Sequence, residues 1–285
     1  MNLSEKKKEN KHPLAIGKVE VPDAEYKSEV PERMTNKDFP GFPTCVIFLG
    51  KPGSGKTNTF IYMLKSPTFW NKFFDKIYLL GPTTQSDKLY KQIKVPEDQV
   101  VSSEDEFIPR LQEWVEQQKA EVDSDPSNAP KTLFVFEDIT SYFDQVQRQP
   151  AFARCYTQIR HLKGTAVAMI HKYKAFNRTA RMSSRHLLIW ECNKTEQKQI
   201  YDDFGPSSLS LKDWYGLVRY CHEPTEDDPK PFLYINTMVP EKIRFRKGFY
   251  EILVLEDAAD KGSDLLQSDN TSKVAGSTKK RKFME

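Results

Sequence analysis

The sequence predicts an α/β fold with a mostly parallel central sheet flanked by helices. Short apolar runs rich in β-branched and aromatic residues alternate along the chain with segments of helical periodicity. A glycine-rich turn joins the first apolar run, 44–49, to the first helical segment, 56–65. Strands that are buried on both faces and separated by helices are typical of parallel sheets.

The predicted strands are short apolar runs bounded by turn signals. The run at 75–80 reads DKIYLL and ends at Gly81 and Pro82, which interrupt regular structure. The run at 133–136 reads LFVF and ends in two acids. The other predicted strands cover 44–49, 165–170 and 186–190, with two late ones at 231–236 and 250–255.

The predicted helices follow the spacing of apolar residues. Beyond 56–65, helical segments are expected at 151–162 and at 194–220, the latter interrupted near Gly205. Residues 117–130 are expected to form a polar loop. Ser103 and Glu106 form a capping-box pattern, and the helix after it places five apolar residues on one face: Phe107, Ile108, Leu111, Trp114 and Val115.

Composition indicates one sizeable domain at 41–255 between two polar tails, 1–40 and 256–285. The chain has 285 residues, of which 38% are hydrophobic, and a net charge of +3. Its longest apolar runs are far shorter than the ~20 residues of a membrane span, so no membrane segment is expected. The basic N-terminus has no apolar segment after it and is not expected to be a secretory signal. The four cysteines form no CxxC motif, so we expect neither a zinc site nor disulfides. This cysteine pattern suits the reducing interior of a cell.

The loop from Gly50 to Thr57 reads GKPGSGKT and fits the phosphate-binding pattern GxxxxGK[ST]. Its glycines allow backbone N–H groups to turn inward around a phosphate, and the following helix N-terminus adds positive potential. We therefore expect the loop to bind ATP, with Lys56 on the β- and γ-phosphates and the Thr57 hydroxyl on Mg²⁺. The residues concerned are Gly50, Lys51, Pro52, Gly53, Ser54, Gly55, Lys56 and Thr57.

Glu137 and Asp138 end the apolar run at 133–136. A buried strand delivers side chains at its carboxyl end with little positional freedom. One acid there can hold Mg²⁺ while its neighbour orients and deprotonates a water. We assign Glu137 to Mg²⁺ and Asp138 to the water, and the pair favours hydrolysis over simple binding.

Residues 145–190 contain nine Lys or Arg and no acid, so they carry +9 while the rest of the chain carries −6. A solvated helix face usually mixes both signs of charge. Two uses suit an acid-free stretch: an arginine acting at a neighbouring subunit's nucleotide, and contacts to nucleic-acid phosphates.

Several segments together resemble the viral genome-packaging ATPases of the FtsK/HerA superfamily, in the branch of poxviruses, giant viruses, virophages and Polintons. Arg160 and His161, the strand ending at His171, then Tyr173 and Arg181, are similar to that family's RH–strand–QxY…RxN segment. The segments 75–84 (DKIYLLGPTT) and 245–249 (FRKGF) are similar to its second-strand and C-terminal segments, and the resemblance covers about 41–255.

This resemblance implies a RecA-like P-loop fold of the additional-strand, catalytic-acid type. It also implies a ring of subunits, a pentamer or a hexamer, with ATP at the interfaces and double-stranded DNA in the channel. His171 then lies at the strand end that senses the γ-phosphate, and Arg181 acts in trans, with Arg178 and Arg185 as substitutes. The chain departs from the family in having His171 for Gln, Glu-Asp for Asp-Glu or Asp-Asp, and Ser183 for Asn. Alternatively, His171 satisfies a backbone carbonyl and the arginines are surface residues.

The predicted function is an ATP-hydrolysing translocase that packages double-stranded viral DNA into a capsid, with the capsid vertex as a partner. The expected site of action is inside the host cell: the nucleus if the basic run Lys279–Lys282 is read as an import signal, otherwise a cytoplasmic virus factory, with virion association as a further expectation. Three alternatives stay open: an ATP-dependent helicase or replication/recombination factor, a nucleotide or nucleoside kinase, and a nucleotide-bound assembly protein without turnover.

Overall fold

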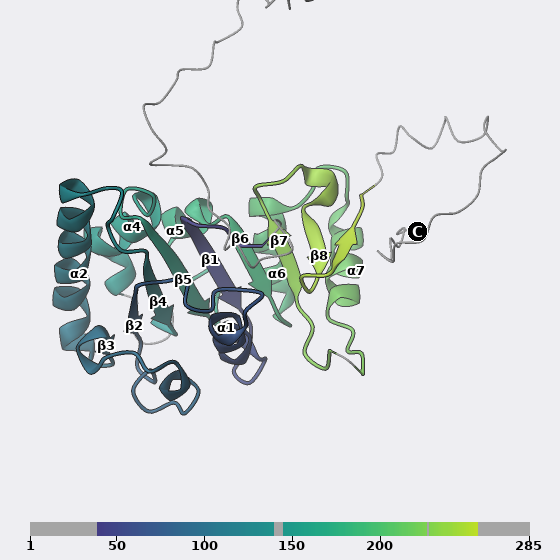
Figure 1. The fold of residues 1–285 in the computed structure, drawn as a ribbon. Coiled ribbons are helices and arrows are strands. Elements are labelled where there is room, and N and C mark those ends of the chain that lie inside the picture. Colours follow the sequence, from purple (N-terminus) through teal and green to yellow (C-terminus); the bar gives the residue numbers. More distant parts are fainter. Residues whose placement is uncertain (1–38, 140–144, 227, 256–285) are drawn as a thin grey trace, which may run out of the picture.

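A nine-stranded sheet forms the centre of the molecule in the computed structural model, which describes residues 39–139, 145–226 and 228–255 (Figure 1). The strands are β1 (Thr44–Leu49), β2 (Lys76–Leu80), β3 (Val100–Val101), β4 (Thr132–Glu137), β5 (Gly164–Ile170), β6 (His186–Ile189), β7 (Leu233–Asn236), β8 (Phe245–Lys247) and β9 (Glu251–Leu253). Their order is β3-β2-β4-β5-β1-β6-β7-β8-β9. The pairs from β3 to β6 are parallel and those from β6 to β9 are antiparallel. The predicted α/β fold with a mostly parallel sheet is confirmed.

An additional strand separates the strand before the phosphate loop from the strand that carries the acids. That strand is β5, which pairs with β1 on one side and β4 on the other. β2, which lies between the loop and the acids in the sequence, pairs with the far side of β4. Because β1, β4 and β5 run parallel, the residues that follow them meet at one edge of the sheet.

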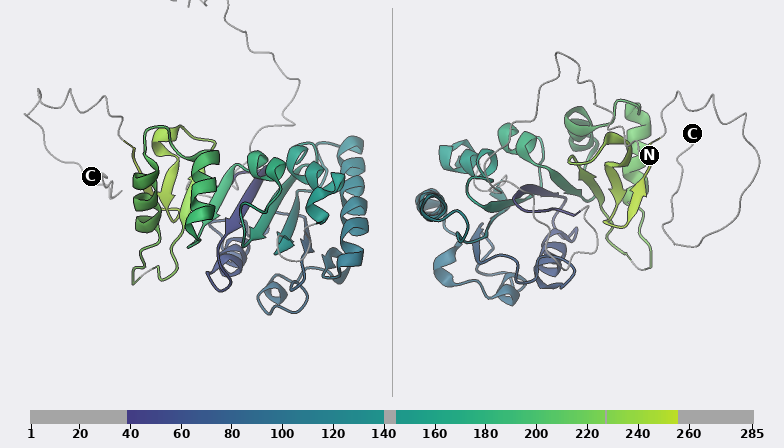
Figure 2. Two further views of the ribbon diagram at one scale, coloured as in Figure 1. Left: turned by 180° about the vertical axis from the view of Figure 1, so that it is seen from behind. Right: turned by 45° about the horizontal axis from the view of Figure 1, so that its top comes forward.

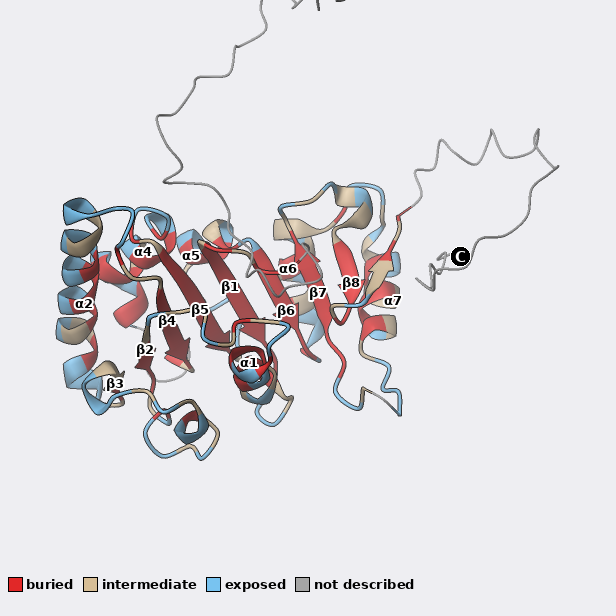
Figure 3. Cartoon of the chain, viewed as in Figure 1, coloured by how far each residue is buried: buried red, intermediate tan, exposed pale blue. Residues whose placement is uncertain are grey.

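The strands are buried on both faces, and alternate residues pack into two separate cores. In β1, Cys45, Ile47 and Leu49 face one core, whereas Val46 and Phe48 face the other. Every residue of β1, β4 and β5 is buried (Figure 3). This burial explains why these strands read as continuous apolar runs in the sequence.

Helices cover both faces of the sheet. α1 (Lys56–Lys65) lies on one face, where Phe60 and Met63 pack against Val46 and Phe48. Figure 2 shows the other α-helices gathered on the opposite face, where they bury residues such as Trp114 and Trp214. They are α2 (Glu104–Ser124), α4 (Pro150–Thr157), α5 (Arg178–Ser183), α6 (Lys194–Phe204) and α7 (Leu211–Cys221).

Two predicted element boundaries are wrong. Residues 117–124 continue α2 instead of forming a loop, because Gln118 is fully buried. Its amide donates to the carbonyls of Pro130 and Leu162, at 2.8 and 2.9 Å, and its oxygen accepts from Thr132. α4 ends at Thr157 rather than 162, since the chain then turns through Lys163 (φ 43°) to enter β5.

Other elements agree with the sequence or were not predicted by it. Ser103 is the N-cap of α2 as expected, but its side chain makes no capping hydrogen bond. The break between α6 and α7 falls at Gly205, as expected. β3, α5 and β8 were not predicted, because they are too short to show a period.

The two predicted tails lie almost entirely outside the described residues, and so does Lys279–Lys282. At the inner end of the first tail, Phe39 is buried against the rings of Phe69 and Phe249. All four cysteines are buried and free. Across 39–139, 145–226 and 228–255, no helix has the length and apolar character needed to cross a bilayer.

Candidate functional site

The phosphate loop connects the carboxyl end of β1 to the N-terminus of α1. Gly53 and Gly55 have φ angles of 74° and 110°, in the region that side chains rarely adopt, so this path requires glycine at both positions. Gly55 is the N-cap of α1, whose first residues are Lys56 and Thr57. The loop therefore points the free N–H groups of a helix N-terminus toward the edge of the sheet.

Lys56 is folded back onto its own loop. Its ammonium donates to the carbonyls of Gly50, at 2.7 Å, and Lys51, at 3.1 Å, and lies 3.1 Å from Nδ1 of His171. Burial lowers the pKa of Lys56 to about 8, against the opposing charges of Asp138 and Glu137. To reach a phosphate, this side chain exchanges two carbonyl partners for stronger anionic ones.

We expect the affinity for magnesium-free ATP to fall as the pH rises through about 8. Above that pH the amine of Lys56 is neutral and must take up a proton to pair with phosphate, which costs up to about tenfold in affinity per pH unit. Calorimetric titration with ATP at several values above pH 7 measures this slope. Lys56→Arg should remove it, because arginine stays protonated. A flat profile for the unmodified protein would contradict the expectation.

Glu137 is a buried carboxylate held by hydroxyl groups. Its Oε2 accepts from Thr83 at 2.7 Å, and its Oε1 lies 3.4 Å from the Thr57 hydroxyl. Burial raises the pKa of Glu137, while hydrogen bonds from Thr83, Tyr90 and Thr57 oppose that rise. Oxygen donors of this kind suit Mg²⁺. Among the residues that the structure describes, no cluster of three or more His, Cys, Asp or Glu could hold a metal ion.

Asp138 follows β4 with a left-handed backbone, φ 50°, which aspartate tolerates better than most residues. Its side chain is 18% exposed and its Oδ1 lies 3.6 Å from Nε2 of His171. That oxygen is buried and makes no hydrogen bond to any described residue. An unsatisfied buried carboxylate oxygen is costly, and a bound water would satisfy it.

His171 follows β5 and connects the loop to the acids. Its Nδ1 lies 2.7 Å from the Gly50 carbonyl oxygen, and its Nε2 faces Asp138. Nδ1 can donate to that carbonyl only when it is protonated, and it can accept from Lys56 only when it is not. The contact with the Gly50 carbonyl matches the alternative role of His171, which is to satisfy a backbone carbonyl. γ-Phosphate sensing by this ring stays a prediction.

Arg181 lies away from this cluster, on α5, with its side chain only 8% exposed. Its guanidinium lies 3.3 Å from Asp203 and 4.9 Å from the ring centroid of Tyr173. The Tyr173 hydroxyl donates to the same carboxylate at 2.9 Å. Within one subunit, Arg181 is therefore engaged in an internal ion pair, whereas Arg178 and Arg185 are exposed.

The basic stretch 145–190 is divided between several places in the fold. Arg154 pairs with Glu116 at 2.7 Å, and Lys163 donates to the carbonyls of Pro126 and Ser127. The stretch also contains β5, whose residues are all buried. These partners come from outside the stretch, so part of its positive charge is engaged within the subunit.

A cavity of about 450 Å³ is lined by residues of the phosphate loop, by Glu137 and Asp138, and by His171. The sequence predicted most of its lining: Gly53, Lys56, Thr57, Glu137, Asp138 and His171. It did not predict Thr83, Asp87 or Lys230, which also line the cavity. The segment 75–84 pointed to the region of Thr83, but no pattern in the sequence pointed to Lys230.

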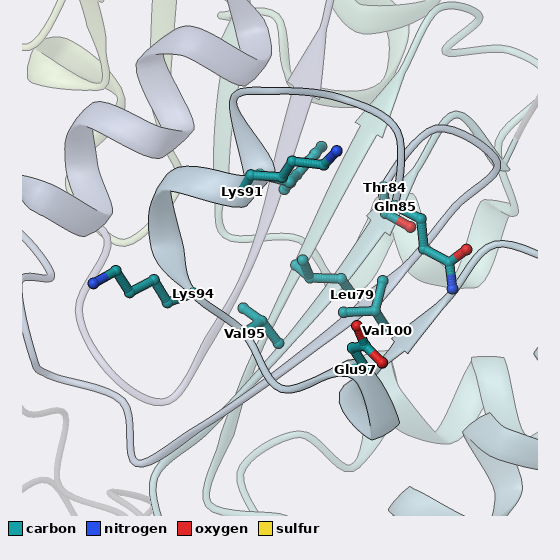
Figure 4. Close-up of a pocket in the computed structure, with 9 residues that line it drawn as sticks. Leu79, Thr84, Gln85, Lys91, Lys94, Val95, Glu97 and Val100 are labelled. Carbon is teal, nitrogen blue, oxygen red and sulfur yellow. The ribbon is translucent and has the colours of Figure 1, made fainter.

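A larger cavity, of about 550 Å³, is lined by residues of β2, of the segment that follows it and of β3 (Figure 4). Thr84, Gln85, Tyr90 and Lys91 line it, and Figure 4 shows Lys94 directed away from Gln85 and Glu97. It contains neither the phosphate loop nor the acids. We therefore place the chemistry in the smaller cavity.

Comparison with known proteins gives one family. A family model described as "Poxvirus A32 protein" matches residues 32–210. A search of the curated proteins finds no match.

Some solved structures are similar to this chain at low identity. The DNA-packaging ATPase B204 from Sulfolobus Turreted Icosahedral Virus has 13% identity and a TM-score of 0.48, over 68% of this chain and 93% of that one. The B204 genome packaging NTPase from Sulfolobus turreted icosahedral virus 2, in complex with AMPPCP, has 14% identity and a TM-score of 0.46, over 68% and 93%. EssC from Geobacillus thermodenitrificans has 11% identity and a TM-score of 0.44, over 68% of this chain and 37% of that one. Likeness at this level assigns neither a site nor an activity.

Proposed function

The chain belongs to the family of the poxvirus A32 protein, and we propose that it hydrolyses ATP to move double-stranded DNA into a viral capsid. The family match confirms the predicted resemblance to the poxvirus branch of the packaging ATPases. The main support for this activity is that residues of the phosphate loop line the same cavity as Glu137, Asp138 and His171.

The site residues divide into two roles. Thr57 and Glu137, 3.4 Å apart, would hold Mg²⁺. Mg²⁺ held by these two residues would supply positive charge against the negative charge that develops in the transition state. Lys56 leaves the Gly50 carbonyl and binds the phosphates. This geometry supports the assignment of Glu137 to the metal side of the site.

Asp138 is the proposed acceptor for the attacking water. Its unpartnered oxygen orients the water and takes one proton. The water oxygen bonds to the γ-phosphorus, the bond from that phosphorus to ADP breaks, and ADP leaves with the bonding electrons. His171 would detect whether the γ-phosphate is present, a role supported by its contacts with Asp138 and the Gly50 carbonyl.

The proposal includes a ring of subunits in which an arginine of α5 or its flanks completes the neighbour's site. Arg181 would have to exchange Asp203 for that site's phosphate, since the two are paired within the subunit. Arg178 and Arg185 are exposed and need no such release. A pentameric or hexameric ring, the capsid vertex as partner, action inside infected cells, and nuclear import through Lys279–Lys282 also belong to this proposal.

We expect double-stranded DNA to stimulate ATP hydrolysis at low salt and to lose this effect at high salt. A motor that tracks the phosphate backbone with several Lys or Arg loses about 10³-fold or more in affinity between 50 and 200 mM salt. Steady-state ATPase rates over a DNA titration at both concentrations measure it. A strand-separation assay on the same samples distinguishes a helicase. Absence of stimulation at both salt concentrations would count against translocation.

A further inference from the structure

Lys230 reaches the phosphate loop from a distant part of the chain, the segment between α7 and β7. Its ammonium donates to the carbonyl of Gly53 at 2.7 Å. A methyl group built on Gly55 would lie 3.4 Å from Cδ of Lys230, so the aliphatic part of the side chain crosses the loop closely. Lys230 also lines the cavity that contains the acids.

The backbone that carries Lys230 is anchored beneath the loop. The indole N–H of Trp190 donates to the Lys230 carbonyl at 3.0 Å. The Trp190 ring packs against Phe232, with centroids 4.8 Å apart, and stacks on Phe48 of β1, with centroids 5.9 Å apart. The position of Lys230 is therefore fixed by the core, whereas its exposed ammonium can change partners.

The two ends of the cavity differ in charge. Glu137 ends β4, Asp138 follows it and His171 follows β5, so all three lie on one side of β1. Lys230 is held by Trp190, which follows β6, on the other side of β1. A nucleotide that places its γ-phosphate beside the acids extends its remaining phosphates away from them. The cation at the opposite end then lies where the negative charge of those phosphates must be balanced.

We propose that Lys230 binds the phosphates shared by ADP and ATP, exchanging the Gly53 carbonyl for a phosphate oxygen. This assignment rests on the proposed function, because it names a further ligand of the same nucleotide. Lys230 then contributes equally to the binding of ADP and ATP. It contributes nothing that distinguishes the γ-phosphate, which is the task of the acids and His171.

The test compares Lys230→Ala, Lys230→Arg and the unmodified protein by calorimetric titration with ADP, with ATP and with inorganic phosphate. Lys212, exposed on α7, provides a charge-matched control as Lys212→Ala. Loss of a charge-assisted hydrogen bond should weaken ADP and ATP binding alike by about tenfold, with kcat nearly unchanged. Lys230→Arg should stay within about twofold of the unmodified protein, because its guanidinium also donates to phosphate.

Three results would overturn the assignment while leaving the proposed function intact. They are unchanged ADP affinity in Lys230→Ala, failure of Lys230→Arg to restore affinity, and a fall in kcat without a fall in affinity, which would mean that Lys230 only shapes the loop. If the unmodified protein binds neither ADP nor ATP, both the assignment and the proposed function fail.

Discussion

Asp138→Asn should lower kcat for ATP hydrolysis by about two to four orders of magnitude, the usual contribution of a general base. The amide keeps the size of the carboxylate but cannot accept the proton of the attacking water. Asparagine also tolerates the left-handed backbone, φ 50°, that this position requires. The fold and the affinity for ATP should therefore be unchanged, and both are measured alongside the rate.

Glu137→Gln is the matched control, because it alters the neighbouring acid by the same chemical change. Its main effect should be on Mg²⁺, since Glu137 lies beside Thr57. We expect a higher Mg²⁺ concentration for half-maximal ATPase activity, and a smaller loss of kcat once Mg²⁺ is saturating. A normal hydrolysis rate in Asp138→Asn would remove this residue from the proposed mechanism, and normal rates in both variants would remove the pair.

Arg181→Ala should destabilise the fold by about 3 kcal/mol, because it leaves the carboxylate of Asp203, which is only 13% exposed, without its cation. The Tyr173 ring would also lose the guanidinium that packs over it. Urea denaturation measures the loss in the isolated subunit, where no neighbour contributes. Arg178→Ala, an exposed arginine on the same helix, should change the stability by no more than about 0.5 kcal/mol.

The double variant Arg181→Leu with Asp203→Leu separates a structural role from a role in trans. Removing both charges should recover most of the stability that Arg181→Ala loses, since a buried ion pair is often replaceable by apolar residues. If this stable variant keeps full ATPase activity in the assembled protein, Arg181 is a structural residue. If it is inactive and is rescued by mixing with Lys56→Ala subunits, Arg181 acts in trans. Equal stability of Arg181→Ala and the unmodified protein would contradict the first part of the expectation.

The parts predicted well from sequence are those where local chemistry and tertiary environment agree. β1, β4 and β5 are buried on both faces, so every position selects an apolar residue and the run is visible. The phosphate loop is equally visible because its backbone path requires glycine at Gly53 and Gly55. Order along the chain then placed Glu137 and Asp138 near the loop, because parallel strands end at one edge.

The parts predicted poorly depend on contacts between distant residues. α2 continues through polar residues only because Gln118 bonds to Pro130 and Leu162. Lys230 lies far from the loop in sequence, with no local motif to mark it. The ion pair between Arg181 and Asp203 could not be predicted from the basic segment. The spacing of its arginines does not indicate which acid each one contacts in the fold.

The two outer strands of the sheet have a consequence for assembly. Within the part of the chain that the structure describes, the sheet ends in β3, with two residues, and β9, with three. Such short edges expose few unpaired backbone groups, and therefore offer little template for strand addition from another molecule. Copies of this subunit are expected to meet through side chains and not through a shared sheet. Their contacts could then loosen and re-form in each catalytic cycle without breaking a backbone ladder.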